Sequence, residues 1–336
     1  MLTGLQSVLC RRYIRLSRES QIEGLSKQCK HCIEGVDARM SAKLIDGKAV
    51  AAAVRADCKK RVQSLQDRYG RTPGLAVIMV GDNPASEVYV RNKIGACRDV
   101  GIRSEKLLYP ADVSQAEVIE RIEALGSDPN TDGILVQLPL PKSFDIKTVL
   151  GAINAAKDVD GFHLYNVGGL VIGDTVFPPC TPYGVMCLLE NENIEVAGAN
   201  AVVVGASNIV GKPMALMLMQ REATVSVCHA RTRDLAEFTK LADILVVAAG
   251  QPNLITAPMV KEGATVIDVG INRLPNGKLV GDCDFAGVRE KASYLTPVPG
   301  GVGPMTVTML LVNTISSAER TLSQAPQEPT AEALRA

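Results

Sequence analysis

The sequence predicts two α/β domains, and three observations lead to this prediction. The chain has 336 residues, and a typical domain of about 150 residues gives a prior of two domains. From Leu75 onward, short β-rich runs alternate with helical patterns, as in βαβ units. An acidic, glycine-rich loop over 158–161, followed by further glycines and prolines, interrupts this alternation and indicates a domain boundary near residue 160.

The first block, 40–160, is expected to fold as one α/β domain. Its strands are predicted over 75–81, 105–109 and 133–138, and its helices over 86–100, 114–125 and 146–156. The last helical pattern of the chain, 305–322, is predicted to pack back on this block and complete the domain.

The second block, 161–304, repeats the alternation with more apolar strands, predicted over 201–205, 223–228, 243–250, 264–270 and 294–296. Apolar runs of this kind are typical of parallel strands that are buried on both faces. An open parallel sheet binds its ligand at the carboxyl ends of its strands. We therefore expect functional residues in the loops that follow Gly205, Cys228, Gly250 and Gly270.

Both ends of the chain lack this pattern. Residues 1–39 carry four arginines before the first acidic residue, Glu19, as a mitochondrial presequence does. The simpler interpretation is an upstream start codon, because patterned sequence begins directly after Met40; the extension is then disordered or not translated. Residues 323–336 are rich in Pro, Gln, Glu and Ala without periodicity and are predicted to be a flexible tail.

The charge balance and composition narrow the classes of partner. Lysine and arginine together number 36, as do aspartate and glutamate, so the whole chain has no net field to attract nucleic acid or an anionic membrane. Aromatic residues make up 4% and tryptophan is absent, which argues against a base-stacking surface. No run of about 18 apolar residues is present, so no membrane-spanning helix is expected. Small-molecule ligands are favoured.

Nine cysteines at irregular spacing lie in a chain too long to need disulfide staples. This usage indicates a reducing compartment, and we expect the protein in the cytoplasm. The one close cluster, Cys29-Lys30-His31-Cys32, resembles half of a zinc site, but no second pair of ligands lies at the required spacing. No bound metal is predicted.

A turn in the second block has the context of a nucleotide site. The strand 201–204 runs into Gly205-Ala206-Ser207 and, after Gly211, into a helical pattern. Gly205 permits the tight turn, Gly211 allows close helix packing, and the helix N-terminus offers N–H donors and a positive dipole end to a pyrophosphate. The middle glycine of the G-x-G-x-x-G fingerprint is replaced by Ser207, so an ordinary βα turn stays open as an alternative.

The choice of cofactor is decided at the end of the next strand, where an acidic residue would hold the ribose hydroxyls of NAD. The segment Cys228-His229-Ala230-Arg231-Thr232-Arg233 supplies cations instead, which suits the 2′-phosphate of NADP. NADP is the expected cofactor and Arg231 the candidate phosphate ligand. The alternative is a basic loop that is merely solvated.

The helical pattern 86–100 brings Tyr89 and Lys93 to one face, about a turn apart. A lysine acts as a general acid or base near neutral pH only if burial or a neighbouring cation lowers its pKa. Packing of Tyr89 and solvation of Lys93 is the alternative. Tyr-x-x-x-Lys also occurs in short-chain dehydrogenases, but there the pair follows the nucleotide loop, whereas Lys93 precedes Gly205.

Two further polar residues are candidates for the same chemistry. Gln137 sits at the carboxyl end of the apolar run 133–138, and Asp160 follows Lys157-Asp158-Val159. As alternatives, Gln137 satisfies buried backbone groups and Asp160 caps a turn.

Taken together, these segments resemble, in order, the bifunctional methylenetetrahydrofolate dehydrogenase/methenyltetrahydrofolate cyclohydrolase family, from about Lys43 to Leu322. The resemblance is carried by six segments: Tyr89-Val90-Arg91-Asn92-Lys93, Val136-Gln137-Leu138-Pro139-Leu140-Pro141, Lys157-Asp158-Val159-Asp160-Gly161-Phe162-His163, Gly205-Ala206-Ser207, Asp268-Val269-Gly270-Ile271-Asn272-Arg273 and Pro297-Val298-Pro299-Gly300-Gly301-Val302-Gly303-Pro304-Met305-Thr306. Each segment alone is weak, whereas the ordered set is specific. The bacterial-type enzymes are the most similar, because many eukaryotic relatives carry Arg where this chain has Ala206. With Ala at this position, more of the contact to the cofactor phosphate is expected from the Arg231 loop.

The resemblance implies a role for each catalytic candidate. Lys93 would carry out the proton transfers and activate water, and Gln137 would hydrogen-bond to it and hold its orientation. Tyr89 would stack on the folate ring system, and Asp160 would accept hydrogen bonds from the amino-bearing edge of the pterin.

The resemblance also implies binding residues. Gly205, Ala206, Ser207 and Arg231 would bind the cofactor, and Ile271 would line the nicotinamide pocket with its backbone. The Pro299-Gly300-Gly301 loop would approach the substrate closely, because it lacks bulky side chains.

For the whole chain, the resemblance implies an N-terminal catalytic α/β domain and a C-terminal Rossmann-type NADP-binding domain, with a cleft between them that holds both ligands. The implied activity is NADP-dependent oxidation of 5,10-methylenetetrahydrofolate to the 5,10-methenyl form, followed by hydrolysis to 10-formyltetrahydrofolate. A homodimer is expected, with a role in one-carbon supply for purine, methionine and histidine synthesis. Two alternatives stay open: an NADP-linked dehydrogenase of another small substrate, and a non-catalytic nucleotide-binding protein on the same fold.

Overall fold

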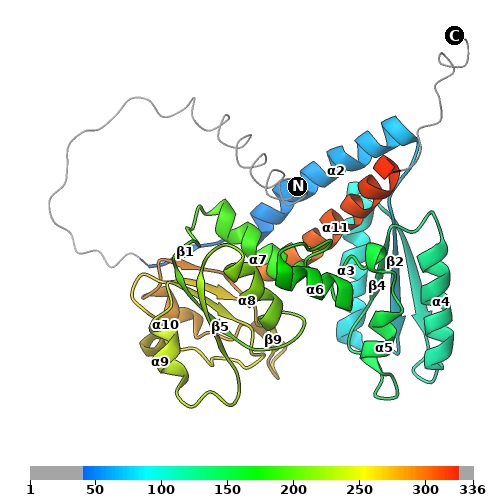
Figure 1. Ribbon diagram of the computed structural model, residues 1–336. Helices are drawn as coiled ribbons and strands as arrows, with labels where there is room; N and C mark the ends of the chain where they lie inside the picture. The colour runs from blue at the N-terminus through cyan, green and yellow to red at the C-terminus, as the bar shows by residue number, and fades with distance from the viewer. Residues whose placement is uncertain (1–40, 325–336) are drawn as a thin grey trace, which may run out of the picture. The chain divides into compact units, whose positions relative to one another are not determined.

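The computed structural model describes residues 41–324, which divide into two compact units (Figure 1). Within the described chain, the six-stranded unit comprises residues 41–51, 168–175 and 181–306, and the three-stranded unit comprises 52–167, 176–180 and 307–324. The predicted extension with its cysteine cluster, and most of the predicted tail, lie outside the described residues. None of the described helices is long and apolar enough to cross a membrane.

The three-stranded unit is built on a parallel sheet of order β3-β2-β4. Its strands are β2 (Gly74–Val80), β3 (Arg103–Tyr109) and β4 (Gly133–Val136). Every residue of β2 and β4 is buried, as expected for apolar strands covered on both faces. The edge strand β3 is more polar and more exposed. The three predicted strands are confirmed to within two residues at each end.

Two helices cover this sheet. Helix α3 (Pro84–Val100) connects β2 to β3, and α4 (Gln115–Ser127) connects β3 to β4. Because the two right-handed crossovers run in opposite directions along the sheet, they leave the helices on opposite faces, as Figure 1 shows. The Ser114 hydroxyl accepts the Glu117 N–H at 3.2 Å and begins α4, whose apolar face joins the core of the sheet.

The predicted helix 146–156 is shorter than expected. It consists of α5 (Ile146–Gly151) and a separate 3₁₀ turn, η2 (Ala155–Lys157). The Asn154 side chain accepts the Ala156 N–H at 3.0 Å and so starts the new turn in place of a continued helix.

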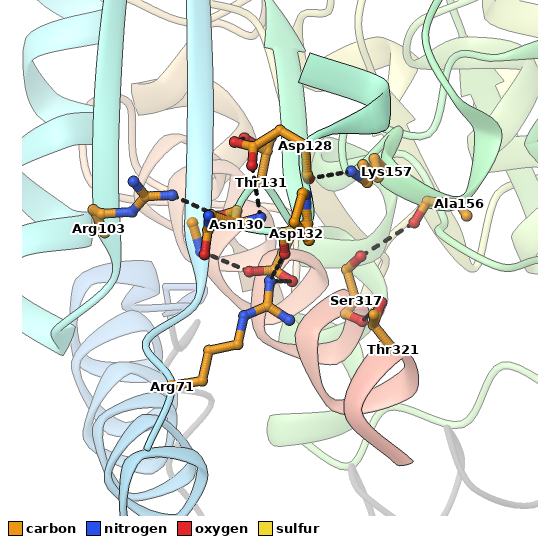
Figure 2. Close-up of polar contacts among 12 residues, drawn as sticks. Arg71, Arg103, Asp128, Asn130, Thr131, Asp132, Ala156, Lys157, Ser317 and Thr321 are labelled. Carbon is orange, nitrogen blue, oxygen red and sulfur yellow. Dashed lines mark hydrogen bonds and ion pairs between the residues drawn. The ribbon is translucent and has the colours of Figure 1, made fainter. Parts of the chain in front are cut away.

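A polar network joins the amino ends of the strands in this unit (Figure 2). Asp132, which is 2% exposed, accepts the N–H of Gly74 at 2.8 Å and the guanidinium of Arg71 at 2.8 Å. Arg103, at the start of β3, donates to the carbonyl of Asn130 at 2.5 Å. Ligands of α/β sheets bind at the opposite, carboxyl ends of the strands, so we assign this network to stability.

The six-stranded unit contains a parallel sheet of order β1-β11-β8-β7-β5-β6. Its strands are β1 (Lys43–Leu44), β5 (Asn200–Val204), β6 (Thr224–Cys228), β7 (Ile244–Val247), β8 (Thr265–Asp268) and β11 (Tyr294–Leu295). The helices α8 (Gly211–Met219), α9 (Leu235–Thr239) and α10 (Phe285–Arg289) lie between them in the chain. The five predicted strands are confirmed, and β1 adds an edge that was not predicted.

Several elements were not predicted. They include α2 (Gly47–Tyr69), α6 (Leu164–Ile172), α7 (Cys180–Asn191) and the antiparallel pair β9 (Asn272–Arg273) and β10 (Leu279–Val280), and the short helices α9 and α10 were not predicted either. Glycines and prolines conceal two of these helices. Helix α6 contains Gly168 and Gly169, and α7 carries Pro182 in its first turn, where proline costs no hydrogen bond. The predicted last helix is confirmed as α11 (Val302–Gln324).

Candidate active site

Lys93 and Gln137 meet in the three-stranded unit. Lys93 on α3 is only 9% exposed, and its Nζ donates a hydrogen bond to Gln137 Oε1 at 3.1 Å. Gln137 directly follows β4. Its side-chain Nε2 donates to the carbonyl oxygen of Leu138 at 2.7 Å, and its backbone N–H donates to the carbonyl oxygen of Ile78 at 2.8 Å. Because the amide group and the backbone of Gln137 are both fixed, its side-chain oxygen is held toward the lysine.

Asp160 is electrostatically coupled to this lysine. Burial raises the pKa of the Asp160 carboxyl, the positive charge of Lys93 opposes this rise, and the Asp158 carboxylate adds to it. Lys93 therefore offsets only part of the effect of burial, and the site combines a buried amine with a buried carboxyl group whose pKa stays above its ordinary value.

The backbone next to Asp160 is fixed by buried hydrogen bonds. The Asp158 carboxylate, 1% exposed, accepts the N–H of His163 at 2.7 Å and the side-chain amide of Asn166 at 2.8 Å. Asn313 on α11 donates to the carbonyl of Val159 at 2.8 Å. These contacts hold the segment rigidly on either side of Val159 and limit how Asp160 moves.

Tyr89 lies one turn before Lys93 on α3, as the spacing predicts, and is 40% exposed. An exposed aromatic ring next to a buried polar pair offers a stacking surface for a flat ligand. The alternative of a fully packed Tyr89 and a solvated Lys93 is wrong in both parts, because the lysine is the buried member of the pair.

The remaining candidates belong to the six-stranded unit and follow the ends of its strands. Because its strands are parallel, their carboxyl ends lie along one edge of the sheet, where α/β proteins bind ligands. The residues that follow them are Gly205, Ala206 and Ser207 after β5, Arg231 after β6, Ile271 after β8, and Pro299, Gly300 and Gly301 after β11.

The turn after β5 requires its glycines. Gly205 has a φ of 121°, and a Cβ placed there would lie 2.2 Å from the carbonyl oxygen of Ala248. A Cβ at Gly211 would lie 2.0 Å from the carbonyl oxygen of Gly205, so the start of α8 packs directly on the turn. At Gly250, after β7, a Cβ would meet nothing within 4 Å. The sheet edge therefore combines a tight glycine turn with open space at the neighbouring loop, which fits a dinucleotide.

Ser207 organises this turn. Its hydroxyl accepts hydrogen bonds from the backbone N–H groups of Val210 at 3.1 Å and Gly211 at 3.4 Å. Its backbone carbonyl accepts a hydrogen bond from the N–H of Lys212 at 3.0 Å. These N–H groups, which were expected to serve a pyrophosphate, are engaged within the turn itself. A serine in place of the middle glycine thus has a structural role in starting α8.

Arg231 lies in a loop beside this turn. Strands β5 and β6 pair in register from Asn200 and Thr224 to Val204 and Cys228, and the Gly205 N–H donates to the Cys228 carbonyl at 2.9 Å. The loop is shaped by the backbone N–H of Arg231, which donates to His229 Nδ1 at 3.2 Å. The Arg231 residue is exposed, so its guanidinium is available to an anionic group.

Two further loops complete this edge. Ile271 is 44% exposed and precedes Asn272, whose side chain is held by a buried carboxylate. Gly300 has a φ of 113°, and a Cβ on Gly47 would lie 1.8 Å from the Gly301 carbonyl oxygen. The Pro299-Gly300-Gly301 loop is therefore closely packed against the start of α2.

Sequence reasoning missed the residues that support these loops. Asp282 and Asn313 belong to no motif that the sequence analysis identified. Asp268 was named only as the first residue of the segment 268–273. Asp282 lies within Gly281-Asp282-Cys283-Asp284, which has the composition of an exposed turn, yet Asp282 is fully buried. Only the fold brings it to the loops that it supports. No group of three or more possible metal-ligating side chains (His, Cys, Asp or Glu) is found among residues 41–324.

A nucleotide-type loop edge on one α/β unit and a buried lysine site on another define a nucleotide-dependent α/β enzyme. Residues 45–160 match the family model for the tetrahydrofolate dehydrogenase/cyclohydrolase catalytic domain, and residues 179–322 match the model for the NAD(P)-binding domain of the same family. The chain belongs to the tetrahydrofolate dehydrogenase/cyclohydrolase family, as its motifs predicted.

Individual relatives agree with this membership. The bifunctional protein FolD of Nitrosospira multiformis is 62% identical over 281 residues, which cover 84% of this chain and 97% of that protein. The crystal structure of the bifunctional FolD methylenetetrahydrofolate dehydrogenase/cyclohydrolase from Campylobacter jejuni is 51% identical with a TM-score of 0.82, covering 84% of this chain and 100% of that one. The Trypanosoma brucei FolD structure, complexed with NADP cofactor and inhibitor, is 40% identical with a TM-score of 0.81, covering 84% and 99%.

Proposed function

We propose that this chain is a bifunctional enzyme that oxidises 5,10-methylenetetrahydrofolate to 5,10-methenyltetrahydrofolate with NADP and hydrolyses the product to 10-formyltetrahydrofolate. The observation that carries the proposal is the hydrogen bond between buried Lys93 and Gln137, next to Asp160, within the residues that match the family's catalytic domain. Relatives named as bifunctional at about 60% identity support both activities.

For the dehydrogenase step, bound NADP would accept a hydride from the methylene carbon. The chain's contribution is alignment: Gly205, Ala206 and Ser207 form the turn that faces the cofactor, and the exposed Arg231 pairs with its 2′-phosphate. Ile271 contributes backbone to the nicotinamide pocket. The glycine turn, the open space at Gly250 and the position of Arg231 in the loop after the neighbouring strand β6 support this assignment.

For the cyclohydrolase step, Lys93 activates the attacking water and moves the proton as the ring opens, while Gln137 holds the Lys93 amine in place. Asp160 binds the donor edge of the pterin, and Tyr89 stacks on its ring system. The Pro299-Gly300-Gly301 loop approaches the folate with backbone. The burial of Lys93, its bond to Gln137 and the exposure of Tyr89 support these roles.

The proposed domains are a catalytic domain over 40–160, completed by helix 305–322, and a Rossmann-type NADP-binding domain over 161–304, with an extension over 1–39 and a tail over 323–336. The assignment of residues 52–167 and 307–324 to one compact unit supports the contribution of the last helix to the first domain.

We further propose that the enzyme is a cytoplasmic homodimer that supplies one-carbon units for purine, methionine and histidine synthesis. Strand β3 supports the dimer: within residues 41–324 it pairs only with β2, and its Leu108 is 56% exposed, which leaves a sheet edge for a second copy. The buried thiols of Cys58, Cys97, Cys228 and Cys283 support a reducing compartment.

Replacing Lys93 with Met tests the function. We expect Lys93→Met to lose cyclohydrolase activity, because the side chain keeps its bulk but has no proton to move, and to keep binding tetrahydrofolate and NADP. The measurement is the decay of 5,10-methenyltetrahydrofolate absorbance above the spontaneous rate, with ligand binding followed by calorimetry. Lys59→Met, at an exposed position on α2, is the matched control and should hydrolyse normally. Hydrolysis by Lys93→Met at the wild-type rate would overturn the assignment.

A further inference from the structure

One buried carboxylate joins two loops at the carboxyl edge of the six-stranded sheet. Asp282 Oδ2 accepts the backbone N–H groups of Ala249 at 2.7 Å and Gly250 at 2.9 Å, in the loop after β7. Its Oδ1 accepts the side-chain amide of Asn272 at 2.8 Å, directly after Ile271 in the loop that follows β8. Asp282 is fully buried, and it meets three donors with an acceptor-only group.

A second carboxylate fixes Asp282. Asp268, at the end of β8, accepts the N–H groups of Gly270 at 3.0 Å, Asp282 at 2.9 Å and Cys283 at 2.9 Å. Its own N–H donates to the Thr296 hydroxyl at 2.7 Å. The backbone of Asp282 is thereby tied to the end of a strand, so its carboxylate has a defined position.

Two glycines make room for these carboxylates. A Cβ at Gly270 would lie 2.2 Å from the Asp282 carboxyl group, and a Cβ at Gly281 would lie 1.9 Å from Asp268 Oδ2. Both loops are therefore built around the acidic pair, and neither glycine position tolerates a side chain without moving a carboxylate.

We propose that Asp282 is a positioning residue for NADP: it holds the loop at Ala249 and Gly250 and, through Asn272, the backbone at Ile271, so that both face the cofactor correctly. The inference rests on the proposed function, because it assigns these loops to the nicotinamide end of NADP. Strands β7 and β8 pair with each other along their whole length without using Asp282, so the carboxylate orders the loops rather than the sheet.

The test compares the two activities of one variant. In Asp282→Asn, the carboxylate with its two acceptor oxygens is replaced by an amide with one acceptor oxygen. The NH₂ group of the amide then faces N–H donors, with which it cannot form a hydrogen bond. We expect KM for NADP to rise by about tenfold or more and dehydrogenase kcat to fall, as for the loss of one hydrogen bond to a charged group. Cyclohydrolase activity, assayed with 5,10-methenyltetrahydrofolate and without NADP, should stay within about twofold of wild type, because Lys93 and Gln137 lie in the other unit. Asp284→Asn, two residues away and without a side-chain cap bond, is the control and should resemble wild type.

A second variant covers the case in which Asp282→Asn does not fold. Asn272→Ala removes the side-chain bonds from Asn272 to Asp282 Oδ1 and to the Gly281 carbonyl, and it leaves the bonds from Asp282 to Ala249 and Gly250. It should raise KM for NADP by about threefold with hydrolysis unchanged. Equal losses of both activities, or unchanged NADP kinetics in both variants, would overturn the inference. Wild-type protein inactive in both assays would instead contradict the proposed function. Calorimetric titration with NADP would then decide the inference alone: weaker binding by Asp282→Asn supports it, and equal binding contradicts it.

Discussion

At the scale of single residues, polar groups in the two units are controlled by burial and by a few fixed partners. Lys93 is largely shielded from solvent. Its amine donates to Gln137 Oε1 at 3.1 Å and interacts electrostatically with the carboxyl group of Asp160. Such an arrangement holds an amine in one place for proton transfer, which a freely moving lysine does not offer. In the other unit, Asp268 is equally buried, but its partners are backbone N–H groups.

The pH dependence of stability tests the account of Asp268. Burial, which outweighs its hydrogen bonds, raises the pKa of Asp268 from 3.8 to about 6. Because the folded-state pKa lies above the unfolded value, protonation favours the folded state, and this contribution grows as pH falls through 6 and is complete below 3.8. The quantity to compare is the difference in the free energy of unfolding between wild type and Asp268→Asn. We expect this difference to rise by about 1 kcal/mol in favour of wild type when the pH is lowered from 7 to 5.

Denaturant unfolding at a series of pH values measures this difference, and carboxyl NMR reports the midpoint directly. A difference that stays constant or falls on acidification would contradict the account of Asp268.

At the scale of elements, the strands were largely predictable and several helices were not. Parallel strands buried on both faces need continuous apolar runs, and these identify β2, β4, β5, β7 and β8 directly. Helix α6 was not predicted because it contains two glycines, one of which serves the following turn: a Cβ at Gly169 would lie 2.5 Å from the Asp174 carbonyl oxygen. Asn154 divided a predicted helix by a side-chain hydrogen bond that periodicity does not reveal.

The amino-end network of the three-stranded sheet gives a prediction about stability alone. Asp132→Ala leaves the buried N–H of Gly74 without its acceptor and Arg71 without its ion pair, so the free energy of unfolding should fall by about 2 kcal/mol. KM and kcat of the remaining folded protein should not change, because the network lies at the end of the sheet opposite to Gln137. Urea unfolding with parallel activity assays measures both, with Glu123→Ala on the exposed face of α4 as control. A change in KM without a loss of stability would contradict this assignment.

At the scale of the whole molecule, both units follow one rule: chemistry-bearing residues come after the carboxyl ends of parallel strands. Order along the chain therefore indicated Gln137, Gly205, Arg231 and Ile271 as candidates before the fold was known. It did not indicate Asp282 or Asn313, because their partners are distant in sequence and each lies in a segment whose composition suggests another role. Supporting residues of this kind become visible only when the fold brings distant segments together.

The most direct test of the central claim is a spectrophotometric assay of the purified chain with 5,10-methylenetetrahydrofolate, run in parallel with NADP and NAD. Reduced cofactor and the acid-stable methenyl product are followed together. We expect turnover with NADP, followed by loss of the methenyl product faster than its spontaneous hydrolysis. Turnover with NAD alone would contradict the role given to Arg231, and no turnover with either cofactor would contradict the proposed function.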